Sequence, residues 1–531
     1  MNRAFFRRRT FGITLLLILL QACVAYCQTP RSGAKPPAAK SSAAHHINVL
    51  FLMTDEQHFR SLSINGNPYI TTPNMDRVGR EGVRFDNATC VTPYCSPSRA
   101  SIITGVYPHT HRILLNVSPR RNRQPALRQD AFPNTETILH NAGYATAHRG
   151  KWHLGNPGNF DCYQSWSYAG RTGRGYRQFL NQELPAARFA DDTSPGKYQG
   201  RPVKMIPAIE AGYRRFQAIP NNRLSYIGII GCSVIPPELL PETQITNQVI
   251  DLLEQNADKP FMITASWSPP HDLWVIPEPY YSMVDRSKIE LQGDWDMAPW
   301  DRNGPSRRLG ECVGPDGVRE YMAIYYGMVK YIDDQVGRVL HKLDELGLAN
   351  NTLVIFTTDH GDMVGAHGCV GKSIFGFYDD LVHIPLMMRL PGRITPGTVV
   401  HQPVSQVDYM PTILDYTGFT IPSNIHGRSM RPLIEGRHVP WRDYAFCQRA
   451  DAGRMLRTDH FKFVYRPRPR VVALYDLKKD PHEDHNLADD PAFAEIVRAL
   501  HQKLIQVMTR DGDPAVDKFR ADPLANTASR K

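Results

Sequence analysis

The sequence lacks a long apolar run beyond its N-terminal region, lacks a Cys-x-x-Cys pair and shows no internal repeat. A transmembrane helix needs about 20 apolar residues, so the first absence argues against a chain that spans a membrane. The nine cysteines are irregularly spaced, which argues against a structural zinc site. What remains is an ordinary composition, with 42% hydrophobic and 21% charged residues, which is typical of a globular protein.

A strong charge of either sign is also absent. The formal net charge is +10, but the first 27 residues carry Arg3, Arg7, Arg8 and Arg9 and no acid, which leaves +6 for the rest of the chain. So small an excess on so long a chain does not indicate a nucleic-acid partner, although it is compatible with anionic substrates.

The N-terminus has the pattern of a targeting segment. A basic stretch precedes the apolar run FGITLLLILL at residues 11–20, which is too short to span a membrane. We therefore predict a signal peptide over residues 1–27, a flexible Pro/Ala/Ser-rich linker over 28–46, and a periplasmic or extracellular location. The stretch LQAC leaves open a lipid anchor at Cys23, and VAYCQ offers an ordinary cleavage site instead.

Export permits disulfides, but the sequence does not determine which cysteines pair. Removal or lipidation of Cys23 and Cys27 leaves seven cysteines, which are Cys90, Cys95, Cys162, Cys232, Cys312, Cys369 and Cys447. If Cys95 has another role, six remain, and many pairings are compatible with their spacing.

The order of apolar patterns predicts an α/β fold. Short apolar runs at 47–53, in KPFMITASW and in NTLVIFTTDHGD predict buried strands, and segments 242–256 and 319–347 have helical spacing. Such alternation predicts a large, mostly parallel sheet flanked by helices. Residues from about 160 to 240 are rich in Gly, Pro and Arg, and we expect irregular excursions around a site there.

The pattern changes near residue 441. HFKFVYRP and VVALYDLKKDP alternate as antiparallel strands do, and PAFAEIVRALHQKLIQVM has the spacing of a closing helix. We predict a catalytic domain over 47–440, a smaller C-terminal α+β domain with an antiparallel sheet over 441–515, and a tail over 516–531.

Polar side chains follow several of the predicted strands. Ligands of parallel α/β proteins bind beyond the carboxyl ends of the strands, so these side chains are expected to share one site. Carboxylate oxygens would suit a hard cation such as Ca²⁺ or Mg²⁺. The residues are Asp55, Glu56, Lys151, His153, His271, Asp359 and His360.

The segment CSPSRASIITG contains the pattern C-x-P-S-R-x-x-x-x-T-G, with Cys95, Pro97, Ser98, Arg99, Thr104 and Gly105 in the fixed positions. This pattern resembles the signature of the sulfatases, which belong to the alkaline-phosphatase-like superfamily. Further motifs are similar to that family's and occur in its order, namely LFLMTDEQ, GVYPHTH, GKWHLG, SPPH, TTDHGD and LYDLKKDPHEDHNLADDP. The resemblance runs from about residue 47 to about residue 490.

The resemblance implies that a maturation enzyme oxidises Cys95 to formylglycine, reading Pro97 and Arg99 while the chain is extended. The hydrated aldehyde carries two hydroxyls on one carbon. One attacks sulfur and displaces the alcohol, and the second then collapses to the aldehyde and releases sulfate. Such a reaction needs a metal, cations for the sulfate oxygens and a proton for the leaving alcohol.

The resemblance also assigns roles to the residues that match its motifs. It implies that Asp55, Asp359, His360 and the modified Cys95 hold the metal, while Glu56 falls where many sulfatases have an aspartate ligand. Arg99 would steady the diol, Lys151 and Lys372 would contact the sulfate, His153 would help to deprotonate the diol, and His271 would lie near the leaving oxygen. His109 and His111 are expected to be structural, and Asp333 and Asp334 to lie on a solvated helix face.

Three functions are compatible with these residues. The first is an exported sulfatase acting on a sulfated carbohydrate, in sulfated polysaccharide degradation. The second is a phosphonate or phosphodiester hydrolase of the same superfamily, and the third is a non-catalytic protein that binds sulfated glycans. Substrate contacts are expected from the region 160–240, including Arg171, Arg174, Arg177, Arg214 and Arg215, from DLWVIPEPYY and from the C-terminal segment. Linkage position, endo or exo action and oligomeric state stay open.

Overall fold

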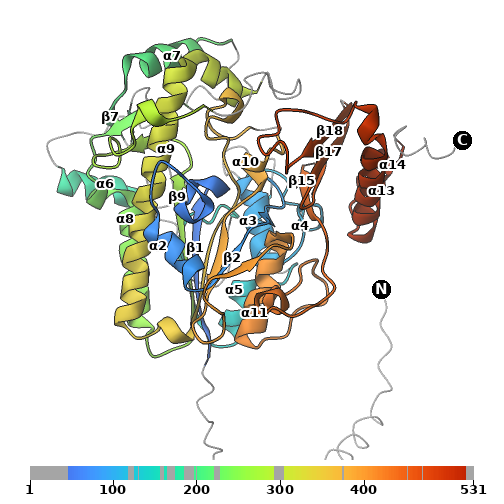
Figure 1. Ribbon diagram of the computed structural model, residues 1–531. Helices are drawn as coiled ribbons and strands as arrows, with labels where there is room; N and C mark the ends of the chain where they lie inside the picture. Colours follow the sequence, from blue (N-terminus) through green and yellow to red (C-terminus); the bar gives the residue numbers. More distant parts are fainter. Residues whose placement is uncertain are drawn as a thin grey trace, which may run out of the picture. The chain divides into compact units, whose positions relative to one another are not determined.

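The computed structural model describes residues 46–117, 125–128, 131–155, 161–163, 174–184, 197–198, 200–220, 228–291, 304–373, 376–450, 453–468 and 470–521 (Figure 1). These residues belong to one compact unit that begins at His46. The predicted signal peptide, nearly all of the predicted linker and the last ten residues of the predicted tail lie outside them. The proposed boundary at 440/441 stays a prediction.

An eight-stranded sheet forms the centre of the unit, in the order β13-β2-β12-β11-β1-β9-β4-β5. Among the described strands, each neighbouring pair is parallel except the two pairs that include β12. This confirms the predicted large, mostly parallel sheet. The strands are β1 (Asn48–Asp55), β2 (Val83–Phe85), β4 (Ala145–Gly150), β5 (Asp161–Tyr163), β9 (Phe261–Pro270), β11 (Thr352–Thr358), β12 (Leu386–Arg389) and β13 (Thr398–Val400).

Strand β1 shows why its sequence is an apolar run. Leu50 and Leu52 pack into the hydrophobic core on one face of the sheet, while Phe51 and Met53 pack into the core on the other face. Successive side chains of a strand point to opposite faces, so a strand with a core on both sides has no position left for a solvated residue. All eight residues of β1 are buried.

Helices cover both faces of the sheet, as predicted. The helices α2 (Pro73–Arg80), α8 (Pro241–Gln255) and α9 (Pro305–Glu345) supply apolar residues to the first core, and α3 (Cys95–Thr104), α5 (Thr135–Asn141) and α11 (Tyr409–Thr417) supply them to the second. Figure 1 shows the two groups on either side of β1. Residues 319–345 of the predicted segment 319–347 belong to the second part of α9, which is interrupted at Gly314 (φ 72°) before Pro315.

The region from 160 to 240 is more regular than we predicted. Its described parts include α6 (Arg174–Glu183), α7 (Pro207–Gln217) and three strands, which form a second sheet in the order β10-β8-β7-β6 together with β10 from beyond the region. The strands are β6 (Lys197–Tyr198), β7 (Arg201–Lys204), β8 (Ile230–Ser233) and β10 (Trp274–Ile276). Very short strands carry too few residues to show a period of two, which is why the sequence pattern did not reveal them.

The C-terminal part contains the predicted antiparallel sheet and closing helix. The sheet has the order β15-β16-β17-β18, with β15 (Ala445–Arg449), β16 (Gly453–Arg457), β17 (Phe461–Pro467) and β18 (Arg470–Asp476). Helix α13 (Ala494–Arg510) packs on it, and α14 (Val516–Arg520) follows. The remaining elements are β3 (Ala88–Thr89), paired with β14 (Val404–Ser405), and the helices α4 (Pro108–His111), α10 (Asp379–Val382) and α12 (Arg431–Ile434).

The prediction of a solvated helix face was wrong for Asp333, whose side chain is fully buried. Its Oδ1 accepts hydrogen bonds from the backbone N–H groups of Asn74 (3.0 Å) and Met75 (2.8 Å), and Lys330 forms an ion pair with it. The first N–H groups of a helix have no partner inside the helix and attract negative charge. Asp333 on α9 therefore caps the N-terminus of α2, a role that its own neighbourhood in the sequence does not reveal.

We expect Asp333→Ala to lower the free energy of unfolding by about 1–3 kcal/mol, because two N–H groups in the first turn of α2 lose their acceptor. Urea denaturation followed by circular dichroism measures this loss. Asp334 is the matched control, since its side chain is partly exposed and bonds only to Lys330 and Tyr280 among the described contacts. An equal loss for Asp334→Ala would contradict the capping role.

Candidate active site

The predicted site residues follow the carboxyl ends of β11, β1, β9 and β4, which are neighbours in the sheet. Asp55 is the last residue of β1, Lys151 directly follows β4, His271 directly follows β9 and Asp359 directly follows β11. Parallel neighbours end at the same edge of a sheet, so these side chains meet there. The structure brings together all of the residues that the sequence analysis selected for this edge.

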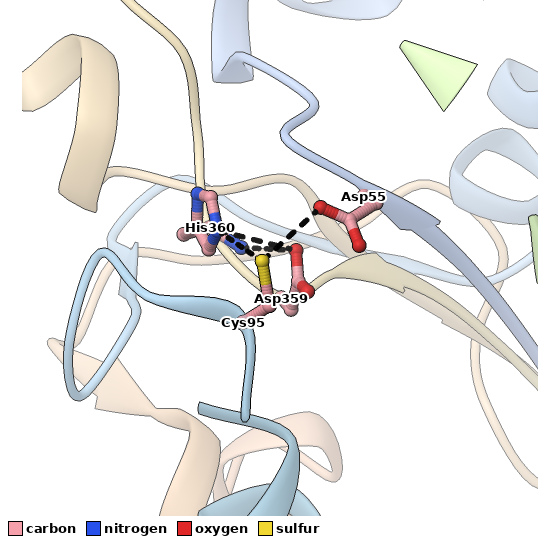
Figure 2. A group of neighbouring side chains, drawn as sticks. All are labelled: Asp55, Cys95, Asp359 and His360. Carbon is pink, nitrogen blue, oxygen red and sulfur yellow. Dashed lines mark hydrogen bonds and ion pairs between the residues drawn. The ribbon is translucent and has the colours of Figure 1, made fainter. Parts of the chain in front are cut away.

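Cys95 is the first residue of α3, and its side chain points into the group formed by the strand ends. Its Sγ lies 3.3 Å from His360 Nε2 and 3.7 Å from Asp55 Oδ1. Figure 2 shows Asp55, Cys95, Asp359 and His360 facing one another. One donor atom from each of the four lies within 4.8 Å of the others, and all four side chains are fully buried.

This donor set fits a divalent cation that prefers oxygen ligands. It offers two carboxylates, one imidazole and, at Cys95, a sulfur that stands in for a hydroxyl oxygen of the expected hydrated aldehyde. The negative charge of the group affects the pKa of His360. Burial by itself lowers the pKa of this imidazole, but Asp359 and Cys95 outweigh burial and raise it to about 9. A cation would neutralise the same excess of negative charge.

Arg99 joins the two aspartates. Its Nε donates to Asp359 Oδ2 (2.8 Å) and its Nη2 donates to Asp55 Oδ2 (3.0 Å), while Nη1 donates to Ser266 Oγ and to the carbonyl of Lys151. The guanidinium is buried with these partners, and a planar fork of donors fixes acceptors in direction as well as distance. Arg99 thus sets the spacing of the two carboxylates from behind.

Two lysines flank the sulfur of Cys95. The Nζ atoms of Lys151 and Lys372 lie 3.6 and 3.7 Å from Sγ, and they form ion pairs with Asp55 and Glu56 respectively. Burial by itself lowers the pKa of each lysine, but the carboxylates and the Cys95 sulfur outweigh it, so each pKa is raised. The site therefore holds two fixed positive charges where an anion would sit against residue 95.

His271 and Glu56 form a second group around the same sulfur. His271 Nε2 lies 3.1 Å from Glu56 Oε1, and its Nδ1 lies 2.8 Å from Asp272 Oδ1. Burial by itself lowers the pKa of His271, but Glu56 and Asp272 outweigh it and hold this pKa well above its ordinary value. A protonated imidazole is the form that can donate a proton to a leaving group. Glu56 pairs here with Lys372, and its carboxylate also belongs to a second group of close donor atoms, together with Asp55, Cys95 and His271.

Two site residues have left-handed backbone conformations, Glu56 with φ 63° and His153 with φ 61°. Such conformations are strained for residues other than glycine and persist only where surrounding contacts fix them. The hydroxyl of Tyr325 donates to the carbonyl of Glu56 (2.6 Å), and the hydroxyl of Ser96 donates to the carbonyl of His153 (2.6 Å). Both bonds come from helices that carry or cover the site.

The side chain of His153 is electrostatically different from that of His271. Burial lowers the pKa of His153, and a hydrogen bond to Cys95 only partly offsets this effect. The imidazole is therefore neutral near pH 7, which is the form that can accept a proton from a group at position 95. The two histidines are thus suited to opposite directions of proton transfer.

Sequence reasoning missed Asn116 and Gln406. Asn116 Nδ2 approaches Cys95 Sγ at 4.0 Å, and its Oδ1 accepts from the N–H of Ser96 (3.1 Å). Gln406 is fully buried, accepts from Ser98 Oγ (2.8 Å) and donates to the carbonyl of Asp359 (2.7 Å). Neither residue follows a strand of the central sheet or belongs to the signature, so no local pattern marked them.

The motifs expected to be structural have structural partners. His111 Nε2 bonds with Ser101 Oγ (3.0 Å), and His109 Nδ1 bonds with Gln448 Oε1 (2.7 Å). Of the arginines expected to meet substrate, Arg214 pairs with Glu210 (2.6 Å) and Arg215 donates to a carbonyl of α9. Arg171 and the side chains of Arg174 and Arg177 lie outside the described residues.

The six described cysteines are free thiols, namely Cys90, Cys95, Cys232, Cys312, Cys369 and Cys447. The side chain of Cys162 lies outside the described residues. In the described part of the chain, no helix is both long enough and apolar enough to cross a membrane.

The sequence of this chain is similar to those of known proteins. The sequence model of the Sulfatase family matches residues 47–419, and the model described as N-sulphoglucosamine sulphohydrolase, C-terminal, matches residues 365–510. The chain is 28% identical to an N-acetylglucosamine-6-O-sulfatase of Bacteroides thetaiotaomicron, over 94% of this chain and 92% of that protein. It is also 28% identical to an arylsulfatase of Clostridium perfringens, over 86% of this chain and 94% of that protein.

The fold is similar to that of solved structures. A phosphonate monoester hydrolase from Silicibacter pomeroyi superposes with a TM-score of 0.72 at 24% identity, covering 88% of this chain and 96% of the other. At that level of identity the similarity concerns the architecture. It supports the layered α/β fold described above and leaves the reaction to the site residues.

Proposed function

Because this chain belongs to the sulfatase family and is a sulfuric ester hydrolase, we propose that it is exported and removes sulfate from a sulfated carbohydrate. We further propose that a formylglycine made from Cys95 by a maturation enzyme acts as the nucleophile, beside Ca²⁺ or Mg²⁺. The observation that carries the mechanism is the burial of Cys95 Sγ between two acidic metal donors and two lysines.

The residues divide the work between two sides of position 95. Asp55, Asp359 and His360 would hold the divalent cation, which supplies Lewis-acid stabilisation of charge on sulfate oxygens. Lys151 and Lys372 face the same sulfur from the other side and would bind oxygens that the cation does not reach. A sulfate group would therefore be held by positive charge all round, with its sulfur opposite residue 95.

Proton transfer follows from the two histidines. The formylglycine supplies a hydrated aldehyde, whose two hydroxyls permit attack on sulfur and then release of sulfate without a second external nucleophile. His153, neutral at pH 7, accepts a proton from position 95, and His271, protonated at pH 7, donates one to the leaving alcohol. Arg99 keeps Asp55 and Asp359 in place throughout, because it bonds to both.

The carbohydrate assignment rests on what the similar proteins act on. The N-acetylglucosamine-6-O-sulfatase is named for a sulfated sugar, and its similarity covers 94% of the length of this chain. The predicted signal peptide supports the same choice, because a polymeric substrate is met outside the cytoplasm. We propose a periplasmic or extracellular location. If the signal peptide is cleaved directly before Cys23, that cysteine would carry a lipid anchor.

Turnover of defined esters tests this function. We expect kcat/KM for at least one sulfated saccharide to exceed that for phenyl sulfate by about tenfold or more, since sugar contacts add binding in the transition state. The assay uses a panel of saccharides with sulfate at different positions, together with phenyl sulfate, phenyl phosphate and a phosphonate monoester. Turnover of aryl sulfates alone would refute the carbohydrate assignment. Preference for the phosphorus esters would favour a phosphonate or phosphodiester hydrolase.

A further inference from the structure

A small cavity lies behind the candidate active site, between the central sheet and helices α3, α5 and α11. It is lined mainly by apolar side chains, and one side of it is formed by Arg99. Besides Thr135, whose hydroxyl donates to the carbonyl of Ile103, three polar residues line it, each from a different element: Glu136 from α5, His148 from β4 and Thr264 from β9. Each of the three is only 3% exposed.

One polar atom of each of these residues has no hydrogen-bond partner among the described residues, namely Glu136 Oε2, His148 Nδ1 and Thr264 Oγ1. Buried polar atoms are nearly always bonded, either to protein or to ordered water. The cavity offers about 20 Å³ to a water-sized sphere, and one water molecule needs about 10–15 Å³ by that measure. The space therefore suits a single water and excludes an organic ligand.

The hydrogen-bonding capacities of the three atoms are complementary to water. His148 Nε2 lies 3.2 Å from the carbonyl of Lys151, and a carbonyl can only accept, so Nε2 carries the proton. Burial lowers the pKa of His148 to about 3, which keeps the ring neutral and leaves a lone pair on Nδ1. Burial also raises the pKa of Glu136 to about 7, so a protonated carboxyl is available as a donor.

We propose that Glu136, His148 and Thr264 bind one buried water molecule behind Arg99, and that this water makes Glu136 a positioning residue for Lys151. The water donates to His148 Nδ1 and exchanges hydrogen bonds with Thr264 Oγ1 and the carboxyl of Glu136. It thereby fixes the tautomer of His148 whose Nε2–H bonds to the Lys151 carbonyl. That carbonyl also accepts from Arg99 (2.5 Å) and Ser266 (2.9 Å), so it joins the water site to the catalytic centre.

The water site stands on the cavity alone, whereas the positioning role rests on the sulfatase reaction proposed above. A high-resolution crystal structure of the wild-type chain tests the first part without any assay. We expect one peak of density within hydrogen-bond distance of Glu136, His148 and Thr264. An empty cavity, or a direct bond between Glu136 and His148 that closes it, would overturn the proposal even if the protein proves to be an active sulfatase.

Two variants test the positioning role. Glu136→Leu removes the polar group and should lower kcat/KM for a sulfate ester by about tenfold, the equivalent of one lost buried hydrogen bond. Glu136→Gln keeps a donor and an acceptor at the same place and should stay within about twofold of wild type. If the glutamine variant loses as much activity as the leucine variant, the water-mediated role is wrong.

Thr264→Val tests the same water from another of its partners, because it removes only the hydroxyl and keeps the shape of the side chain. We expect a smaller loss of kcat/KM than for Glu136→Leu. Because both variants act through the same water, their effects should not add in the double variant. Additive losses would show that the two residues act independently and would overturn the proposal.

Discussion

Replacement of Cys95 by alanine is expected to lower kcat for a sulfate ester by about 10⁴–10⁶-fold, the range seen when a hydrolase loses its nucleophile. The physical reason is local. Sγ of Cys95 lies within 3.7 Å of both lysines and of Asp55, so the substitution removes the group that faces the proposed sulfate position. A steady-state assay on phenyl sulfate measures the loss.

Cys90 is the matched control for this experiment. It is a buried cysteine five residues upstream, and its Sγ contacts the carbonyl of Leu381 outside the group around Cys95. Cys90→Ala removes a small buried side chain close to Cys95 in the sequence, so it tests whether truncation of a buried residue in this segment is harmful in itself. We expect its kcat to stay within about threefold of wild type.

Mass spectrometry of the peptide that contains Cys95 tests directly whether this residue is converted to formylglycine. Protein made in its natural host should carry an aldehyde at residue 95, with the mass expected for loss of the thiol sulfur. An unmodified cysteine in fully active protein would refute the formylglycine mechanism. An unmodified cysteine in inactive protein would instead favour the non-catalytic glycan-binding function.

The sequence predicted which strand-end side chains would lie together at one edge of the sheet, and the reason is geometric. Asp55, Lys151, His271 and Asp359 each follow a strand of a parallel sheet, and such strands end at one edge. Strand-end position is a local property that a single sequence displays. Lys372 has no such position, and only the resemblance to the sulfatases pointed to it; the structure places its Nζ 3.7 Å from Cys95 Sγ.

Residues that act across elements could not be predicted in this way. The sequence around Asp333 is that of a solvated helix residue. In the structure, residues at the N-terminus of α2 donate hydrogen bonds to both of its carboxylate oxygens. The environments of Gln406 and Glu136 also depend on which elements pack together. Gln406 bonds to Asp359, 47 residues away, and Glu136 lines a cavity formed by several elements. A buried polar contact between distant segments leaves no periodic signal in either of them.

The second large effect is expected at Asp359. Asp359→Asn keeps an acceptor for the backbone N–H of His360 (2.9 Å) and removes the negative charge that faces Asp55, His360 and Cys95. We expect it to abolish high-affinity binding of the divalent cation and to lower kcat by about 10³-fold or more, because a cation contributes several kcal/mol of transition-state stabilisation. Equilibrium dialysis of the metal and the phenyl sulfate assay measure the two losses.

Chelation of the wild-type enzyme should reproduce the loss of activity. Addition of Ca²⁺ or Mg²⁺ should restore the wild type and leave Asp359→Asn inactive, and the cation that restores activity at the lower concentration identifies the metal. Full activity of the chelated wild type would contradict the predicted metal site.

Asp333 and Asp359 form a crossed comparison, because both carboxylates are fully buried but serve different purposes. Burial and a second nearby carboxylate, Asp55, raise the pKa of Asp359. In the metal-free protein, the negative charge of Asp359 therefore lowers the stability of the fold. We therefore expect Asp359→Asn to leave the unfolding midpoint of the metal-free protein unchanged or slightly higher, while Asp333→Ala lowers it and leaves kcat intact. Loss of both stability and activity in each variant would show that general packing explains the effects.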